Sequence, residues 1–257
     1  ESAVRIRYNE FEQPGRVNHF DEWIEIPGKQ HRLSTKLDFH PEPRQLETSA
    51  EDSKLLGVSV EYYCIDFLEE VEGTIGDTKH NYYDLNPKLF YGPYGKGYNV
   101  RCPRDGELHS SYVDALKAGQ KQKASFLLTW FWGLTPETVA SALSNHCQKA
   151  GLNPCSTFVW QCALCNNQFR IEATKAEGKY EDFEPFSRMF RHRVEAIGAI
   201  VALMSPWSAP AIIKRVWCIF EIDIASDPGT SIAFSVMLPS EDEKGFIKAL
   251  AQEGMQA

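Results

Sequence analysis

The sequence has no long hydrophobic run. Its longest wholly apolar stretch covers residues 199–204, far short of the roughly 20 residues that a helix needs to cross a bilayer. It also lacks an excess of positive charge, because 27 basic residues stand against 35 acidic ones and give a net charge of -8. We therefore expect no transmembrane segment, and neither nucleic acid nor an anionic lipid surface is an expected partner.

Nucleotide-binding and metal-binding motifs are scarce. No Gly-x-Gly-x-x-Gly opens a helix after a strand, and no Gly-x-x-x-x-Gly-Lys-Ser/Thr is present, so neither a Rossmann site nor a P-loop is expected. Cys162 and Cys165 form one Cys-x-x-Cys, but no second pair follows at a spacing that supplies the four ligands of a structural zinc site. We expect no metal and no bound cofactor.

The seven cysteines are an odd number, and Cys162, Cys165 and Cys218 lie in apolar segments, where a free cysteine behaves as a small hydrophobic residue. This pattern favours a soluble protein in a reducing intracellular compartment or an organelle stroma. The sequence alone does not identify the compartment.

The chain changes in character near residue 120. Its 257 residues, 43% of them hydrophobic, suffice for two ordinary domains. The first part is broken by turn-rich stretches such as residues 91–97, and the alternating segments 4–8 and 58–62 are typical of half-buried strands. We expect residues 1–120 to form an irregular, β-rich lead-in that docks onto another protein, and residues 121–257 to form an α/β domain.

Four short apolar runs alternate with helix-like segments after residue 121. Near-continuous apolar strands between helices are what a parallel sheet covered on both faces requires. The sequence therefore predicts a small doubly wound parallel sheet of flavodoxin-like type, with the strands adjacent in the order 2-1-3-4. The four predicted strands are residues 125–129, 157–164, 199–204 and 232–238.

The intervening helices have recognisable ends. Thr135 is placed to cap the first helix and Gly151 to end it, the third helix is expected after Pro210, and the fourth begins at Ser240, where Glu243 completes a capping box. Each helix should bury one apolar face. The residues expected on these faces are Val139, Leu143, Cys147 and Ala150; Phe186, Phe190, Val194 and Ile197; Ile213, Val216, Trp217, Phe220 and Ile224; and Phe246 and Leu250.

The third run is followed by Ser205 and Trp207, and the next helix carries Trp217-Cys218-x-x-Glu221. This segment resembles the TIR family. In that family a strand ending in serine precedes a helix bearing Trp-Cys-x-x-Glu. The resemblance therefore implies a TIR-like fold.

Two further segments are similar to a TIR-like branch of unicellular eukaryotes. Residues 157–168 form a Trp-containing second strand that ends in a Cys-x-Asn-Gln turn, and residues 97–114 are similar to the lead-in of that branch. The TIR-like resemblance covers roughly residues 95–250. Separately, residues 4–26 partly resemble a chromo-barrel or Tudor-like module, in which an Asp-Glu-Trp strand follows an earlier one. The methyl-lysine cage of such a barrel would need strands before Glu1, so we interpret Trp23 as a core or interface residue.

The TIR resemblance leaves two functions open, and the first is enzymatic. Enzymatic TIR domains cleave the nicotinamide glycosidic bond of NAD with the glutamate of this motif, here Glu221, and self-association completes their site. Thr129, Trp130, Ser205 and Trp207 would then surround the crevice at the carboxyl ends of the strands, with NAD as the substrate.

The helical phase places Glu221 about 80° from the centre of the buried face, at the boundary between core and solvent, where burial can raise a carboxyl pKa. The alternative is a solvated glutamate paired with Lys214 or Lys248.

Other residues depart from the enzymatic pattern. The first strand ends in Thr129-Trp130 where the family has Ser-His or Ser-Arg, and Gln161 stands where an acidic residue often follows the tryptophan. The chain also has 6 Trp, 10 Tyr and 15 Phe, and aromatic residues beyond the needs of a core are characteristic of interfaces. These features favour a non-catalytic TIR-like accessory subunit that docks onto a larger assembly through protein partners or self-association.

Overall fold

The computed structural model describes residues 20–26, 29–35, 48–179, 183–227 and 229–254. By internal contacts the chain divides into two units, residues 1–47 and 48–257. In the first unit, β1 (Phe20–Ile26) and β2 (Lys29–Thr35) pair antiparallel. The Asp-Glu-Trp strand is therefore present, whereas the rest of the chromo-barrel resemblance and the strand expected at residues 4–8 lie outside the described residues.

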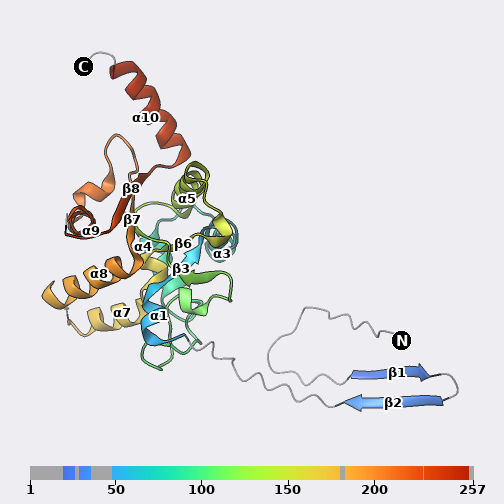
Figure 1. Cartoon of the computed structure of the whole chain (residues 1–257). Coiled ribbons are helices and arrows are strands. Elements are labelled where there is room, and N and C mark those ends of the chain that lie inside the picture. The colour runs from blue at the N-terminus through green and yellow to red at the C-terminus, as the bar shows by residue number, and fades with distance from the viewer. Residues whose placement is uncertain (1–19, 27–28, 36–47, 180–182, 228, 255–257) are drawn as a thin grey trace. The chain divides into compact units, whose positions relative to one another are not determined.

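The second unit is built on a six-stranded mixed sheet (Figure 1). From one edge to the other the strands are β4 (Lys121–Lys123), β3 (Leu56–Ser59), β6 (Phe158–Trp160), β5 (Phe126–Thr129), β7 (Ala199–Leu203) and β8 (Ala233–Met237). β5 is parallel to both β6 and β7, and β8 is parallel to β7. β3 pairs antiparallel with β6 and with β4.

The four strands expected after residue 121 are thus present as adjacent parallel strands, but the sheet as a whole differs from the prediction. Numbered along the chain, its strand order is 2-1-4-3-5-6 rather than 2-1-3-4. Two more strands, β3 and β4, extend the sheet beyond β6; β4 was not expected, and β3 matches the strand expected at residues 58–62 only at Val58 and Ser59, because residues 60–62 are helical. Gly57 permits this extension, because a Cβ at that position would lie 2.9 Å from the carbonyl of Val159 on β6.

Helices account for the other regular elements of the second unit. Before β4 come α1 (Ala50–Leu55), α2 (Val60–Tyr62), α3 (Leu68–Ile75) and α4 (Tyr82–Leu85). After β5 come α5 (Pro136–Ala150), α6 (Cys162–Cys165), α7 (Gln168–Ala176), α8 (Phe183–Ile197), α9 (Val216–Ser226) and α10 (Ser240–Glu253). Among the helices of the described ranges, none is both long and apolar enough to span a bilayer.

The domain boundary expected near residue 120 falls inside the second unit. Tyr63, Phe67 and Tyr82 are fully buried in the same core as Leu127 and Trp160. Residues 48–120 contain one strand, β3, and their other regular elements are helical. This stretch is therefore part of the α/β core and not a β-rich arm.

The helices cover both faces of the sheet. The crossover from β5 to β6 runs along the sheet in the opposite direction from the crossovers that lead to β7 and β8. Right-handed connections therefore place α5 on one face and α8 and α9 on the other, as Figure 1 shows. α10 packs on α5, where the Asn145 side chain donates a hydrogen bond to the Leu238 carbonyl at 3.0 Å.

Helix ends were partly predictable. Thr135 caps α5 by accepting a hydrogen bond from the Thr138 N–H at 3.2 Å, and Gly151 ends the helix in the left-handed region with a φ of 63°. Two expectations were wrong. β6 ends at Trp160 because residues 162–165 turn into α6, and α10 forms no capping box because Glu243 instead accepts a hydrogen bond from Asn145 at 2.7 Å.

The expected buried faces of the last two helices were also wrong. A 3₁₀ turn, Ala211–Lys214, precedes α9, and within α9 only Cys218 and Ile224 are buried. Within the described part of residues 48–257, the sheet ends at β8, and no further strand and helix follow on the outer side of α9. The residues expected in the core but found exposed are Ala150 at the end of α5, Ile213 in the 3₁₀ turn, Val216 and Trp217 of α9, and Phe246 and Leu250 of α10.

Candidate functional site

Glu221 lies on α9 beside the carboxyl end of β5. Its exposed fraction is intermediate, whereas its carboxyl is enclosed, and this burial raises the pKa of Glu221 to about 7. The nearby Thr129 hydroxyl lowers that pKa in part. The contact falls short of a regular hydrogen bond, because the buried Thr129 Oγ1 has no partner in hydrogen-bonding geometry.

No ion pair among the described residues includes Glu221, so the alternative pairing with Lys214 or Lys248 is not formed. Two thiols lie near the carboxyl instead, those of the buried Cys218 and the partly buried Cys162. Burial raises the pKa of Cys162 to about 11 and that of Cys218 to about 12, and the negative charge of Glu221 adds to both shifts. The surroundings of Glu221 therefore disfavour its ionised form.

Aromatic side chains fill the space after β5. Trp130 is buried and meets Tyr82 edge to face, with ring centroids 4.2 Å apart. Trp132 stacks beside Trp130 at 6.2 Å and donates a hydrogen bond from its Nε1 to the Cys162 sulfur at 3.2 Å. The loop after Thr129 thus packs its indole rings against Tyr82 and Cys162 at the end of β5.

Several polar atoms buried around this loop have no hydrogen-bond partner. They are Tyr82 OH, Thr129 Oγ1, Trp130 Nε1 and both side-chain polar atoms of Gln161. These polar groups lie close to one another: Tyr82 neighbours Gln161, Trp130 neighbours the Cys162 thiol, and Thr129 neighbours Glu221, each just outside hydrogen-bonding geometry. Glu221 is the acidic residue next to this group. We therefore define the candidate site as Glu221 together with Tyr82, Thr129, Trp130 and Gln161.

The structure does not bring all the sequence-predicted residues to this site. Ser205 donates a hydrogen bond to the Asp242 carboxylate on α10 at 2.5 Å. Trp207 packs against Phe246 of the same helix, with ring centroids 5.9 Å apart. Thr129 and Trp130 therefore lie with Glu221, whereas the contacts of Ser205 and Trp207 are made with α10.

Three side chains in or beside the site were not predicted to lie there. Tyr82 belongs to the site and comes from α4, in a region interpreted as a separate lead-in. Cys162 and Trp132 adjoin the site; Cys162 was interpreted only as a buried thiol, and Trp132 was not singled out. A helix that folds back from residues 82–85 onto the end of β5 could not be inferred from periodicity.

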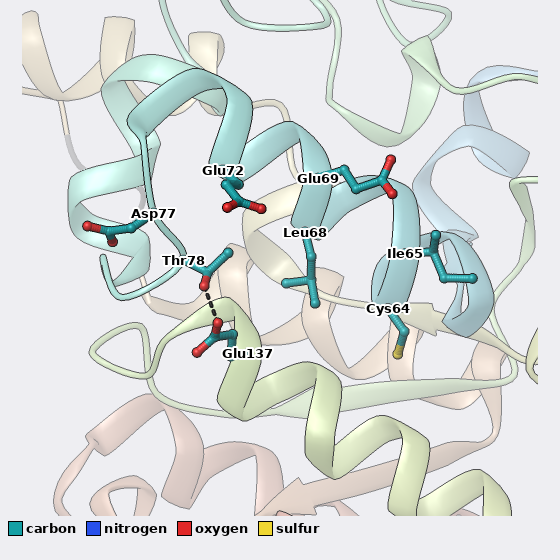
Figure 2. Close-up of a pocket in the computed structure, with 8 residues that line it drawn as sticks. All are labelled: Cys64, Ile65, Leu68, Glu69, Glu72, Asp77, Thr78 and Glu137. Carbon is teal, nitrogen blue, oxygen red and sulfur yellow. Dashed lines mark hydrogen bonds between the residues drawn. The ribbon is translucent and has the colours of Figure 1, made fainter.

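Two cavities lie elsewhere in the second unit, and neither is lined by Glu221. One, of about 370 Å³, lies between α3 and α5 (Figure 2); four of its eight lining side chains are acidic, and Thr78 donates a hydrogen bond to one of them, Glu137. The other, of about 100 Å³, lies among α5, the end of β8 and α10. Within the described part of the chain, no group of three or more His, Cys, Asp or Glu side chains is arranged to hold a metal ion.

Comparison with known proteins gives no independent guide to this site. No protein-family model matches the chain, and neither a curated protein nor a solved structure matches it.

Proposed function

We propose that residues 48–257 form a TIR-like interaction module, a non-catalytic accessory subunit that docks onto another protein. The observation that carries this proposal is an exposed apolar surface along the last strand. We call it the β8 surface, and it comprises the exposed side chains of α9, β8 and α10. Its members are Val216, Trp217, Ile219, Phe234, Val236, Phe246, Ile247 and Leu250.

The exposure of these side chains is unusual for a chain that functions alone. Monomeric proteins rarely expose apolar patches beyond a few hundred Å², and larger ones mark interaction sites. Val216 is 77% exposed on α9, and Val236 is 49% exposed on β8. The docking role expected for residues 1–120 therefore has better support at the other end of the chain.

Two further observations support the TIR-like and non-catalytic parts of the proposal. The helix that bears Trp217-Cys218-x-x-Glu221 follows the third of four adjacent parallel strands, the place that the TIR resemblance implies. Trp130 is buried against Tyr82 and Trp132 directly after β5, and we take this packing as support for a module that binds no dinucleotide there.

The docking function can be tested by placing a photo-crosslinking amino acid at Val216 in the full chain inside its native cells. We expect a discrete covalent adduct with a protein, identified by mass spectrometry. The matched control carries the same amino acid at Tyr94, which is 83% exposed but lies outside the β8 surface. Absence of any adduct at Val216, or equal adducts at both positions, would contradict the proposed docking surface.

A second candidate function is favoured by Glu221 itself. A carboxyl with a pKa raised to about 7 and no cationic partner within the described residues is suited to stabilise the oxocarbenium-like state of glycosidic bond cleavage. The substrate would be NAD, and its cleavage would require the rings of Trp130 and Trp132 to move aside.

This second candidate predicts that Glu221→Ala abolishes nicotinamide release from NAD while the protein stays folded, because the carboxyl lies at a helix edge. Nicotinamide release would be measured by chromatography, and folding by circular dichroism. If the unsubstituted protein, tested at concentrations where it self-associates, releases no nicotinamide above background, the catalytic candidate fails and the non-catalytic proposal gains support.

A further inference from the structure

β8 is an open edge of the six-stranded sheet. Within the described ranges it pairs with β7 alone. The Ala233 N–H donates to the Gly198 carbonyl at 3.0 Å, and the Met237 carbonyl accepts from the Met204 N–H at 3.1 Å. Because alternate residues of a strand turn their peptide groups to opposite sides, Phe234 and Val236 direct their N–H and C=O groups away from β7.

The two edges of the sheet are built differently. The opposite edge strand, β4, has the sequence Lys-Gln-Lys, and lysines are a common device that keeps other strands from pairing with an edge. β8 has the sequence Ala-Phe-Ser-Val-Met, without a charge, a proline or a glycine. This chain therefore protects one edge of its sheet and leaves the other suited to accept a strand.

We propose that the occupant of the β8 surface is a second copy of this chain, paired β8 to β8 in antiparallel fashion across a twofold axis. The inference rests on the proposed docking function and specifies its partner. A strand of Ala-Phe-Ser-Val-Met is self-complementary in this arrangement, since it has no charges that would oppose like charges.

The outward peptide groups fix the register. With Ser235 on the axis, Phe234 lies opposite Val236 of the partner subunit. Both residues turn their peptide groups outward, so each such pair exchanges two hydrogen bonds. An aromatic side chain opposite a β-branched one is also a favourable cross-strand pair.

The exposed apolar area is sufficient for a stable dimer. Seven large apolar side chains of the β8 surface are 40–77% exposed, with Trp217 left out because its ring packs against Phe186 of α8. At about 100 Å² each, the seven present roughly 700 Å² per copy, close to the roughly 800 Å² that one partner contributes to a standard interface. α9 lies on one face of the sheet beside β8, and α10 follows β8 toward the other face, so the twofold axis brings each helix toward its own copy.

Disulfide crosslinking tests whether Ser235 lies on the proposed twofold axis. In the full chain with the exposed Cys155 changed to serine, Ser235→Cys should yield a covalent dimer under mild oxidation, because directly opposed residues that do not share hydrogen bonds have Cα atoms about 4.5 Å apart. Ala233→Cys is the matched control on the same strand. Its two copies would lie four residues apart, about 13 Å, and should remain unlinked.

Sedimentation of the full chain provides the second measurement. Val236→Pro removes only an N–H that points away from β7, so we expect it to weaken dimerisation at least tenfold. Val236→Thr keeps that N–H and should still dimerise. If both cysteine variants link equally or neither links, or if the dimer persists in Val236→Pro, β8 pairing is wrong.

The failure of this inference can be distinguished from the failure of the docking function. A chain that is monomeric at every concentration rules out the second copy as the partner. In that case, a protein adduct at Val216 in the photo-crosslinking experiment would still support docking, with a different partner. If the adduct is absent as well, both proposals fail.

Discussion

Replacing Asp114 by alanine is expected to lower the free energy of unfolding by about 3–5 kcal/mol, because it leaves a buried cation without its counter-charge. The Asp114 side chain is 2% exposed, and Arg104 lies 3.7 Å from its carboxylate. The carboxylate also accepts hydrogen bonds from the hydroxyls of Ser53, Ser110 and Ser111 at 2.7, 2.9 and 2.6 Å. All three hydroxyls would lose an acceptor in the variant.

The Asp114→Ala variant should also weaken a contact with the sheet, because Arg104 links the two regions. Its guanidinium donates a hydrogen bond to the Cys165 carbonyl at 2.7 Å, which joins the segment before β4 to the turn after β6. Without Asp114 this guanidinium, whose side chain is 14% exposed, keeps its charge and loses the group that neutralises it. We therefore expect the midpoint of urea unfolding to fall sharply, with little change in the slope of the transition.

The matched control for this prediction is Asp105→Ala. Asp105 and Arg170 form a two-bond pair at 2.8 and 3.1 Å, but both side chains are 38% exposed. Exposed ion pairs contribute about 0–1 kcal/mol, so this variant should unfold close to the parent protein. Equal losses of stability in the two variants would contradict the assignment of Asp114 as a buried anchor.

Local signals predicted the parts of the fold that local chemistry determines. α5 has its expected capping residue, Thr135, and its expected terminal glycine, Gly151, because both act within a turn of the helix end. The apolar runs marked β5 to β8 as parallel strands, since a strand covered on both faces must be apolar along its whole length.

Long-range pairing was not predictable in the same way. β3 is a four-residue strand whose partners, β4 and β6, lie far along the chain, and no period in the sequence records that pairing. The aromatic residues that suggested a surplus, Tyr63, Phe67 and Tyr82 among them, are fully buried. They extend the core into residues 48–120, which is why the domain boundary was misplaced.

The candidate site was predictable only in part. Helical phase placed Glu221 between core and solvent, and its intermediate exposure agrees. The same calculation assigned Val216 and Trp217 to the core, which is wrong because, within the described residues, the sheet ends at β8 and leaves the outer side of α9 uncovered. Ser205 and Trp207 were assigned to the crevice, but their contacts are with α10, whose path depends on its packing against α5.

We expect the parent protein to lose stability as the pH rises from about 4.5 to 7, and we expect Glu221→Gln to remove that loss. A glutamate in the unfolded chain has a pKa near the model-peptide value of 4.5, whereas burial raises the pKa of Glu221 to about 7 in the folded protein. Between these two values the folded state keeps a proton that the unfolded state has released. Stability therefore declines as the pH rises through this window.

The size of this effect follows from the pKa shift. One pKa unit corresponds to about 1.4 kcal/mol, so the full shift would amount to about 3 kcal/mol. Because Glu221 is partly exposed, water screens its charge, and we expect about 1–2 kcal/mol. Glutamine has nearly the same shape and does not ionise, so the variant should be more stable than the parent protein at pH 8 and nearly equal to it at pH 4.

Urea unfolding of both proteins at pH 4, 6 and 8 would measure the effect, because contributions from all other groups cancel in the difference between the two curves. Asp223→Asn, at an exposed position on the same helix, is the control and should follow the parent protein throughout. If Glu221→Gln also follows it at every pH, the Glu221 carboxyl is solvated and ionised in the folded state. Its surroundings would then no longer favour the catalytic candidate, which depends on an enclosed carboxyl.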